Sequence, residues 1–396
     1  MECNSNINSI IDIFKSLVTV EDSLFDLAPE YDKYIFFRNG IYNLDTLVFR
    51  RRDCSDRFTE SLDWDYKEDY DSDKFDDIHN FFKKIQPEQE QRTFTISFLK
   101  YTLKGGNPQR VFKLNIGYTA ANGKSTEMDM HEAVFPIYTY ELDNTFFSKT
   151  CTKRHKFGAR LVECPIRLAY INELDDGKLD GKFFKKFGDC KNLPLEKMYD
   201  TMTDNSRIQS KLITTSNIDP NINFDPGTSR RTLIQKYESQ FVAKSKVDES
   251  KHRYLMDTYW VDTRFSQDAY KLAYFHFLLS APELVESQYE ANRQLVAEQV
   301  AENDDFLSKL EEQFTITENE SDRVTKFELQ QHFPDMPTRE LNNHLKRFSK
   351  SIVYDKLGSK DINLNGRGVY KGIRKYTQKE SQERETGAEL LIDDPE

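Results

Sequence analysis

The sequence predicts an α/β protein built around a mostly parallel sheet. Four short apolar segments, at 110–116, 167–171, 211–215 and 231–237, have the length and composition of buried strands. Helix-compatible stretches such as 124–134 separate them, and this alternation is typical of a parallel sheet that helices cover. The first of these strands runs into a glycine-rich loop, which predicts a tight connection from strand to helix.

The rest of the chain is predicted to form modules on either side of this core, which we place at 106–245. Residues 1–105 combine a helical pattern at 7–20, a small β-hairpin around Asn39-Gly40, and a helical pattern at 76–103. Residues 246–320 predict a helical region, which we expect to be almost wholly helical at 250–312 and whose aromatic side chains we expect to form core. Residues 321–376 predict a winged-helix-like module, and 377–396 predict a disordered acidic tail.

Composition excludes several classes of protein. The chain has 396 residues and no apolar run of about 18 residues, so no membrane span or membrane contact is expected. Its start lacks the basic-then-apolar pattern of a secretory signal, and five scattered cysteines predict reduced thiols in an intracellular protein. The net charge of −11 does not suit a passive polyanion binder, although 323–376 holds twelve basic and only five acidic residues.

A glycine-rich loop at 117–126 follows the first core strand and precedes a helix, which is the context of a phosphate-binding loop. Its backbone N–H groups and the positive end of the helix bind phosphate. In this interpretation Lys124 contacts the β- and γ-phosphates of ATP, and the Ser125 hydroxyl binds Mg²⁺. Five residues, rather than four, separate the first glycine from Gly-Lys, so either Tyr118 takes that glycine's place or the loop has one extra residue. The candidate nucleotide-binding residues are Gly117, Asn122, Gly123, Lys124, Ser125 and Thr126.

Polar residues end the second and third core strands. Glu173 follows the second, where a carboxylate can activate water or hold the metal, and we expect it to be the catalytic base and a Mg²⁺ ligand. Asn172 occupies a position where many such ATPases have Asp, so metal contact is expected through water or through Asp175. Asn217 ends the third strand and is expected to position the water beside the γ-phosphate.

Two arginines, Arg230 and Arg231, immediately precede the fourth strand. Guanidinium groups stabilise the charge that spreads over the phosphoryl group in the transition state, often from a neighbouring subunit. We expect one of the two to be catalytic. Arg231 is slightly favoured, because it adjoins the strand and should be held more rigidly.

Four motifs follow one another along the chain: Gly-x5-Gly-Lys-Ser, a strand that ends in Glu, a strand that ends in Asn, and Arg-Arg. This order resembles that of the superfamily 3 helicases, and most closely that of the helicase half of the poxvirus-type primase-helicases of large DNA viruses and phages. The segments at 36–44, 184–189, 215–220 and 229–231 resemble the collar entry, the segment after the catalytic Glu, the sensor and the arginine finger of that family. The resemblance implies a P-loop AAA+-like ATPase core with an N-terminal helical collar. The primase half is not expected, because too few residues precede the collar.

The resemblance also implies a homohexameric ring that draws single-stranded DNA through its pore, gripped by a hairpin before the sensor strand. The basic candidates for DNA contacts are Lys197, Arg207 and Lys211 near that hairpin, and Arg339, Lys346 and Arg347 in the winged-helix-like module. Ordinary surface charge is the alternative interpretation in both places. A separate primase or polymerase is a further candidate partner.

We therefore predict an ATP-dependent DNA helicase that forms a ring and translocates on single-stranded DNA during viral DNA replication, in the host cytoplasm or nucleus. Two alternatives remain open at this point. One is a ring ATPase that remodels RNA or protein, and the other is a nucleotide-regulated DNA-binding protein with little turnover.

Overall fold

The computed structural model describes residues 31–53, 56, 58–117, 119–174, 179–190, 193, 208–217, 226–317, 319, 321–334, 336–338, 341–342, 344–345, 352–355 and 369–377. The helix predicted at 7–20 lies outside these residues, as does the predicted acidic tail beyond residue 377. None of the helices in the described part of the chain combines the length and apolar character that a membrane span needs.

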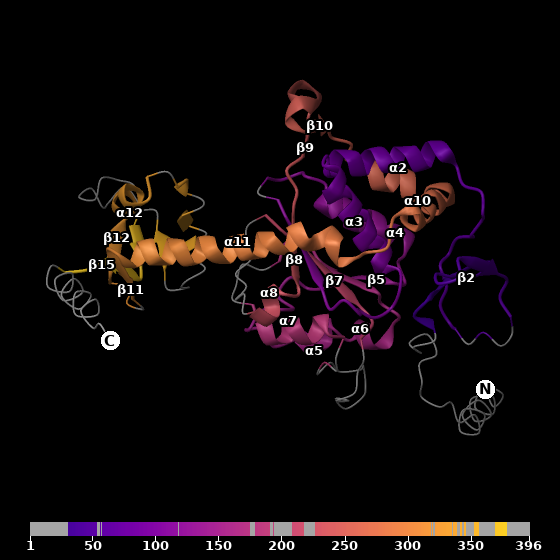
Figure 1. Ribbon diagram of the computed structural model, residues 1–396, viewed down its shortest axis with the longest axis horizontal. Coiled ribbons are helices and arrows are strands. Elements are labelled where there is room, and N and C mark those ends of the chain that lie inside the picture. The colour runs from indigo at the N-terminus through magenta and orange to yellow at the C-terminus, as the bar shows by residue number, and fades with distance from the viewer. Residues whose placement is uncertain are drawn as a thin grey trace, which may run out of the picture.

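A five-stranded sheet in which every strand is parallel to its neighbours forms the centre of the molecule (Figure 1). The strands, in the spatial order β5-β6-β7-β4-β8, are Thr139–Glu141, Leu168–Ile171, Lys211–Ser216, Phe112–Ile116 and Thr232–Lys236. The predicted α/β class and all four predicted core strands are thus confirmed, whereas the sequence does not predict the short edge strand β5. Because the strands are parallel, their carboxyl ends meet at one edge of the sheet.

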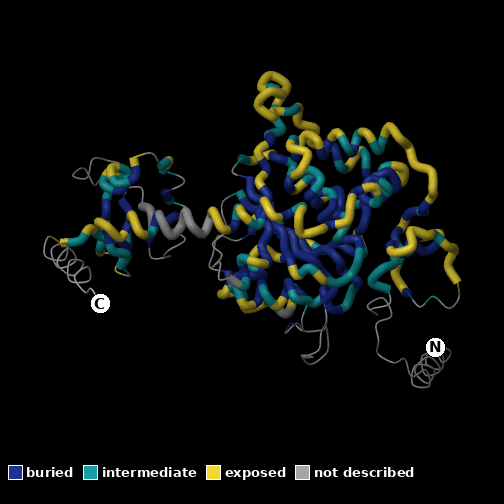
Figure 2. Tube along the Cα trace, viewed as in Figure 1, coloured by how far each residue is buried: buried dark blue, intermediate teal, exposed yellow. Residues whose placement is uncertain are grey.

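The two faces of the sheet support two separate hydrophobic cores. Successive residues of a strand point to opposite faces. Leu168 and Tyr170 of β6 accordingly belong to one core, and Ala169 and Ile171 belong to the other. Four helices cover the first core: α2 (Ser72–Ile85), α3 (Gln89–Thr102), α4 (Lys124–Val134) and α10 (Asp268–Ser280) (Figure 1). Four short helices cover the second: α5 (Arg154–Phe157), α6 (Arg160–Glu163), α7 (Gly181–Gly188) and α8 (Pro226–Ser229). The strands themselves form a buried layer between them (Figure 2).

The N-terminal region packs on the first of these cores. β1 (Tyr34–Phe37) and β2 (Gly40–Asn43) pair antiparallel, which confirms the predicted hairpin, and β3 (Val48–Arg50) adds a third strand. The α2 helix begins at Ser72, earlier than the predicted 76, because Oδ1 of Asp71 accepts hydrogen bonds from two N–H groups of its first turn.

The stretch predicted to be almost wholly helical, 250–312, is only partly so. β9 (Gln240–Val242) pairs in parallel with β10 (Arg253–Leu255), with two short 3-10 turns between them at Lys244–Lys246 and Glu249–Lys251. Asp248 and Arg253 exchange two backbone hydrogen bonds of 3.0 Å, and His252 has a left-handed φ of 54°, which closes the loop and prevents a continuous helix. Helices follow as α9 (Trp260–Phe265), α10 and α11 (Glu286–Glu311).

The α11 helix links the body to a small C-terminal module (Figure 1). It covers the edge strand β8, where Nδ2 of Asn292 donates to the carbonyl of Ile234 at 2.8 Å. Its last turns join a third core with α12 (Lys326–His332) and the strands β12 (Arg323–Thr325) and β14 (Val369–Lys371). β14 pairs antiparallel with β12 and with β13 (Val353–Asp355), and β11 (Phe314–Ile316) pairs antiparallel with β15 (Ile373–Lys375). The helix α12 and the strands β13 and β14 lie where the sequence predicts a helix and two strands, and the predicted wing at 366–368 lies outside the described residues.

Candidate active site

The glycine-rich loop lies at the carboxyl edge of the sheet, between the end of β4 and the start of α4. Gly123, directly before α4, has a φ of 88°, and Ala121 has a φ of 56°, so the backbone passes through left-handed conformations before it enters the helix. A Cβ atom at Gly117 would lie 2.0 Å from Nδ2 of Asn122, so a side chain at Gly117 would displace the loop. Tyr118 lies outside the described residues.

The side chain of Asn122 holds this loop in shape. Its Nδ2 donates to the carbonyl of Thr119 at 2.7 Å, and its Oδ1 accepts from the backbone N–H of Lys124 at 3.5 Å. Ser125, in the first turn of α4, is exposed, and Thr126 is half-buried. A buried lysine, an exposed hydroxyl and a helix N-terminus on one loop are the groups that a Mg²⁺-bound triphosphate requires.

The side chain of Lys124 is buried at the centre of the site, with 5% of its surface exposed. Its Nζ donates to the carbonyl of Gly117 at 3.2 Å and to Oδ1 of Asn217 at 3.0 Å. Burial lowers the pKa of Lys124 to about 8, and the nearby carboxylate of Glu173 opposes this shift.

Glu173 and Asn217 come from the ends of two neighbouring strands, β6 and β7. Nδ2 of Asn217 donates to Oε1 of Glu173 at 3.3 Å, so Lys124, Asn217 and Glu173 form one hydrogen-bonded series. Glu173 has a φ of 56°, and its backbone N–H donates to Oγ1 of Thr215 at 3.1 Å. The structure therefore brings the residues of three separate sequence motifs together beside the loop.

Asn172 faces away from this series. Its Nδ2 donates to Oε1 of Glu141 at 3.1 Å, at the end of β5. Among the residues that the structure describes, no group of three or more His, Cys, Asp or Glu side chains forms a metal site. The protein groups suited to Mg²⁺ are then the Ser125 hydroxyl and the Glu173 carboxylate, and few protein ligands are typical of Mg²⁺ bound with a nucleotide. Asp175 lies outside the described residues.

The two arginines have different surroundings. Arg231 is buried, and its guanidinium binds Asp189 of the same chain at 2.8 Å and the carbonyl of Gly227 at 2.8 Å. Arg230 is exposed. The preference for Arg231 as the catalytic arginine is therefore corrected, because a guanidinium that pairs within its own chain is not available to a nucleotide held by a neighbour.

Lys211 was proposed from the sequence as a DNA contact, and the structure contradicts this. Its side chain is fully buried, its Nζ donates to the carbonyl of Lys104, and it lies 4.6 Å from the centre of the Tyr101 ring. Burial lowers the pKa of Lys211 to about 7. It supports the start of β7 from inside the protein.

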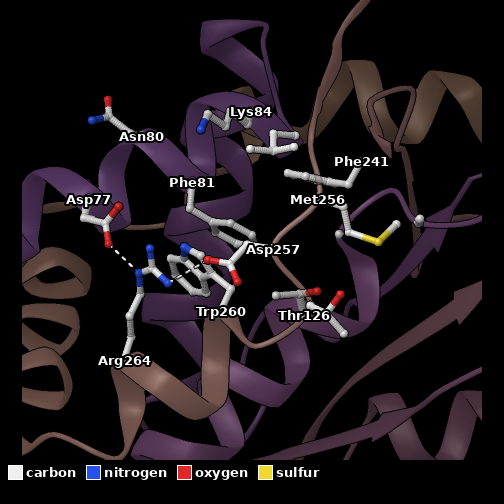
Figure 3. Close-up of a pocket in the computed structure, with 14 residues that line it drawn as sticks. Asp77, Asn80, Phe81, Lys84, Thr126, Phe241, Met256, Asp257, Trp260 and Arg264 are labelled. Carbon is white, nitrogen blue, oxygen red and sulfur yellow. Dashed lines mark hydrogen bonds and ion pairs between the residues drawn. The ribbon is translucent and has the colours of Figure 1, made fainter. Parts of the chain in front are cut away.

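The remaining DNA candidates cannot be placed, because they lie outside the described residues: Lys197, Arg207, Arg339, Lys346 and Arg347. Two features of the site had no signal in the sequence. One is the role of Thr215, whose hydroxyl fixes the backbone of Glu173. The other is a cavity beside the loop, lined by residues from α2, α9 and the β9–β10 segment (Figure 3).

Comparisons with known proteins find several that this chain resembles. The family model described as D5 N terminal like matches residues 2–87. A protein of Acanthamoeba polyphaga mimivirus whose name marks it as a candidate helicase, L207/L206, is 33% identical over 102 residues, which are 26% of this chain and 10% of that protein. A similarly named protein of Invertebrate iridescent virus 3, 121R, is 29% identical over 111 residues, which are 28% of this chain and 12% of that protein. The matches thus span only about a tenth of each relative's length.

Two solved structures of the C-terminal region of NrS-1, both in the A form without ligand, also resemble this chain. One has a TM-score of 0.43 at 12% identity, covering 86% of this chain and 82% of that one. The other has a TM-score of 0.41 at 12% identity, covering 72% of this chain and 68% of that one. Likeness at this level assigns neither an activity nor a partner.

Proposed function

We propose that this chain belongs to the viral D5-type primase-helicase family and is an ATP-dependent DNA helicase of superfamily 3 type that translocates on single-stranded DNA during viral DNA replication. The observation that supports ATP hydrolysis best is the hydrogen-bonded series from Lys124 through Asn217 to Glu173 beside the glycine-rich loop. A base, a polar water-positioning group and a phosphate-binding lysine are the parts that phosphoryl transfer to water needs.

In the proposed reaction, the N–H groups of the loop and the Nζ of Lys124 bind the phosphates. The Ser125 hydroxyl and the Glu173 carboxylate would hold Mg²⁺, which when bound neutralises part of the phosphate charge. Glu173 takes a proton from the attacking water, and the amide of Asn217 orients that water toward the phosphorus.

The position of the arginines supports a ring. Arg231 lies at the amino end of the sheet, where its carbonyl accepts from the N–H of Phe112 at 2.9 Å, whereas Gly117 lies at the carboxyl end. The five residues of β4 span about 17 Å between these edges, so Arg230 lies too far from the loop of its own chain to meet its phosphates. A head-to-tail ring, which we propose to be a homohexamer, would bring Arg230 to the neighbour's nucleotide.

Single-stranded DNA is the proposed substrate of translocation. The segment 323–376 is the most basic part of the chain, and Lys197, Arg207, Arg339, Lys346 and Arg347 are the proposed contacts. A separate primase or polymerase is a proposed partner, and the host cytoplasm or nucleus is the proposed location.

ATP turnover measured with and without single-stranded DNA, together with the native mass of the assembly, tests this function. Stimulation by DNA and a mass of about six chains are the expected results. Stimulation by RNA and not by DNA would favour a remodelling ATPase. Nucleotide binding without turnover in the wild type would favour a nucleotide-regulated DNA-binding protein.

A further inference from the structure

Three polar side chains from three different elements meet in the interior of the protein. Lys113 comes from β4, Glu127 comes from α4, and Tyr237 directly follows β8. Lys113 and Glu127 are fully buried, and Tyr237 has 2% of its surface exposed. The proposed reaction uses none of the three, although two of them carry charge inside the protein.

An ion pair and two hydrogen bonds join these side chains. The Nζ of Lys113 lies 3.4 Å from Oε1 of Glu127 and donates to the hydroxyl of Tyr237, also at 3.4 Å. The Tyr237 hydroxyl donates to the other carboxylate oxygen, Oε2 of Glu127. Burial raises the pKa of Tyr237 well above its ordinary value, and the Glu127 carboxylate adds to this shift. The hydroxyl therefore stays protonated and able to donate.

Tyr237 contacts the chain on both sides of the glycine-rich loop at 117–126. Its backbone N–H donates at 2.7 Å to the carbonyl of Ile116, the residue directly before the loop. Its hydroxyl binds Glu127, the residue directly after the loop. The backbone N–H of Glu127 in turn donates to the carbonyl of Gly123 at 3.0 Å. One residue, more than a hundred positions further along the chain, thus holds both ends of the loop.

Stability alone does not account for a buried ion pair. The removal of two charges from water costs about as much free energy as their attraction returns, and apolar side chains of similar volume often stabilise a fold equally well. Hydrogen bonds and ion pairs are directional, whereas apolar contacts are not, so they fix how one element sits against another. Here they fix the first turn of α4, where Glu127 lies three positions after Lys124. A rotation of this turn would move Lys124 away from Gly117 and Asn217, which its Nζ now contacts.

We propose that Tyr237 and Glu127 form a clamp that keeps the glycine-rich loop in its phosphate-binding shape before a nucleotide arrives, so that both are positioning residues for the ATP site. A loop that is already ordered loses less conformational entropy on binding, and it therefore binds phosphate more tightly. Phe241 supports the same arrangement, because its backbone N–H donates at 2.7 Å to the carbonyl of Ala121 inside the loop. The inference rests on the proposed binding of ATP by this loop.

Tyr237→Phe tests the clamp, because it removes the hydroxyl and keeps the ring and the backbone N–H. Tyr274→Phe is the matched control. The Tyr274 hydroxyl is also buried and also contacts a side chain of α4, at 3.1 Å from Nδ1 of His131, but His131 lies four residues beyond Glu127 and farther from the loop. Each variant loses one buried hydrogen bond to the same helix, so the two should show a similar fall in Tm.

Hydrogen exchange and ligand binding are measured on the full chain. Without nucleotide, the backbone amides of 117–127 should exchange faster in Tyr237→Phe than in the wild type, and at the wild-type rate in Tyr274→Phe. The Kd values for ATP and for inorganic tripolyphosphate should both rise about tenfold in Tyr237→Phe, which corresponds to the loss of one hydrogen bond to a charged group. In Tyr274→Phe both values should stay within twofold of the wild type.

Wild-type exchange of 117–127 in Tyr237→Phe would overturn the clamp and leave the ATP site standing, provided that the wild type binds ATP. Equal changes of exchange or of Kd in the two variants would also overturn it, because they would show a general loss of stability. So would faster exchange in Tyr237→Phe with unchanged Kd values. A wild-type chain that binds neither ATP nor tripolyphosphate would instead overturn the proposed ATP site, and with it the role of the clamp.

Discussion

Asn217 and Lys124, which lie 93 positions apart in the chain, share a 3.0 Å hydrogen bond between Oδ1 and Nζ. The other end of the same amide donates to Glu173 at 3.3 Å. One side chain thus contacts both the group proposed to bind phosphate and the group proposed to activate water. An amide is suited to this position because it donates on one side and accepts on the other.

Asn217→Ala should lower kcat for ATP by about a hundredfold, because removal of one positioned polar group from a transition state has an effect of this size. The Kd for ATP should change by less than about threefold, since Lys124 keeps its place through the carbonyl of Gly117. Steady-state turnover and equilibrium binding measure the two quantities. A loss of affinity as large as the loss of kcat would show that Asn217 mainly shapes the binding site.

Glu173→Gln should keep ATP binding and lose turnover by about a hundredfold or more, because the amide retains the shape and the contact with Asn217 but cannot take a proton. Glu141→Gln, at the end of the neighbouring strand β5, is the matched control and should retain most of the activity. Normal hydrolysis by Glu173→Gln would place the base elsewhere.

The sequence predicts the four core strands, the α4 helix and the residues of the series Lys124–Asn217–Glu173, because strand length and the order of the motifs are local signals. The burial of Lys211 is not predictable in this way, since it depends on Tyr101 and Lys104, more than a hundred positions earlier. The cavity is not predictable from the sequence either, because its walls come from α2, the loop and the β9–β10 segment, and these segments share no sequence pattern.

Nucleotide binding should take up a proton at high pH. Burial lowers the pKa of Lys124 to about 8, so above pH 8 the amine of Lys124 is mostly neutral in the protein without nucleotide. Bound phosphates favour the charged form and raise this pKa, so binding at pH 9 should take up close to one proton and binding at pH 7 almost none. ATP affinity should accordingly weaken as the pH rises above 8.

Calorimetry in two buffers of different ionisation enthalpy measures this uptake. Lys124→Arg is the control, because arginine stays charged at both pH values and should show no uptake from this position. Equal proton uptake at pH 9 by the wild type and by Lys124→Arg would assign the proton to another group.

Deletion of residues 323–396 should weaken the affinity for single-stranded DNA at moderate salt and leave ATP binding unchanged. The deletion removes the basic module together with the acidic tail. The tail has two basic and seven acidic side chains, so its net charge is opposite in sign to that of the module. The difference from the full chain should shrink as salt rises, because phosphate contacts act through the release of counterions. Deletion of 378–396 alone is the control and should not weaken DNA binding. Unchanged DNA affinity of the larger deletion at low salt would contradict a role of the module in DNA binding.

The last prediction separates the two arginines. Arg231→Ala removes the guanidinium that binds Asp189 at 2.8 Å and should lower the free energy of unfolding by about 2 kcal/mol, visible as a lower Tm. Arg230→Ala should leave the Tm unchanged, because the side chain is exposed, and should keep ATP binding while removing hydrolysis.

If Arg230 acts on a neighbour's nucleotide, mixing Arg230→Ala with Lys124→Ala should restore part of the turnover. Such a mixed ring contains interfaces at which an intact Lys124 faces an intact Arg230, whereas an arginine that serves its own chain gives no rescue. Absence of recovery at every mixing ratio, with mixed assembly verified by native mass, would rule out a shared active site.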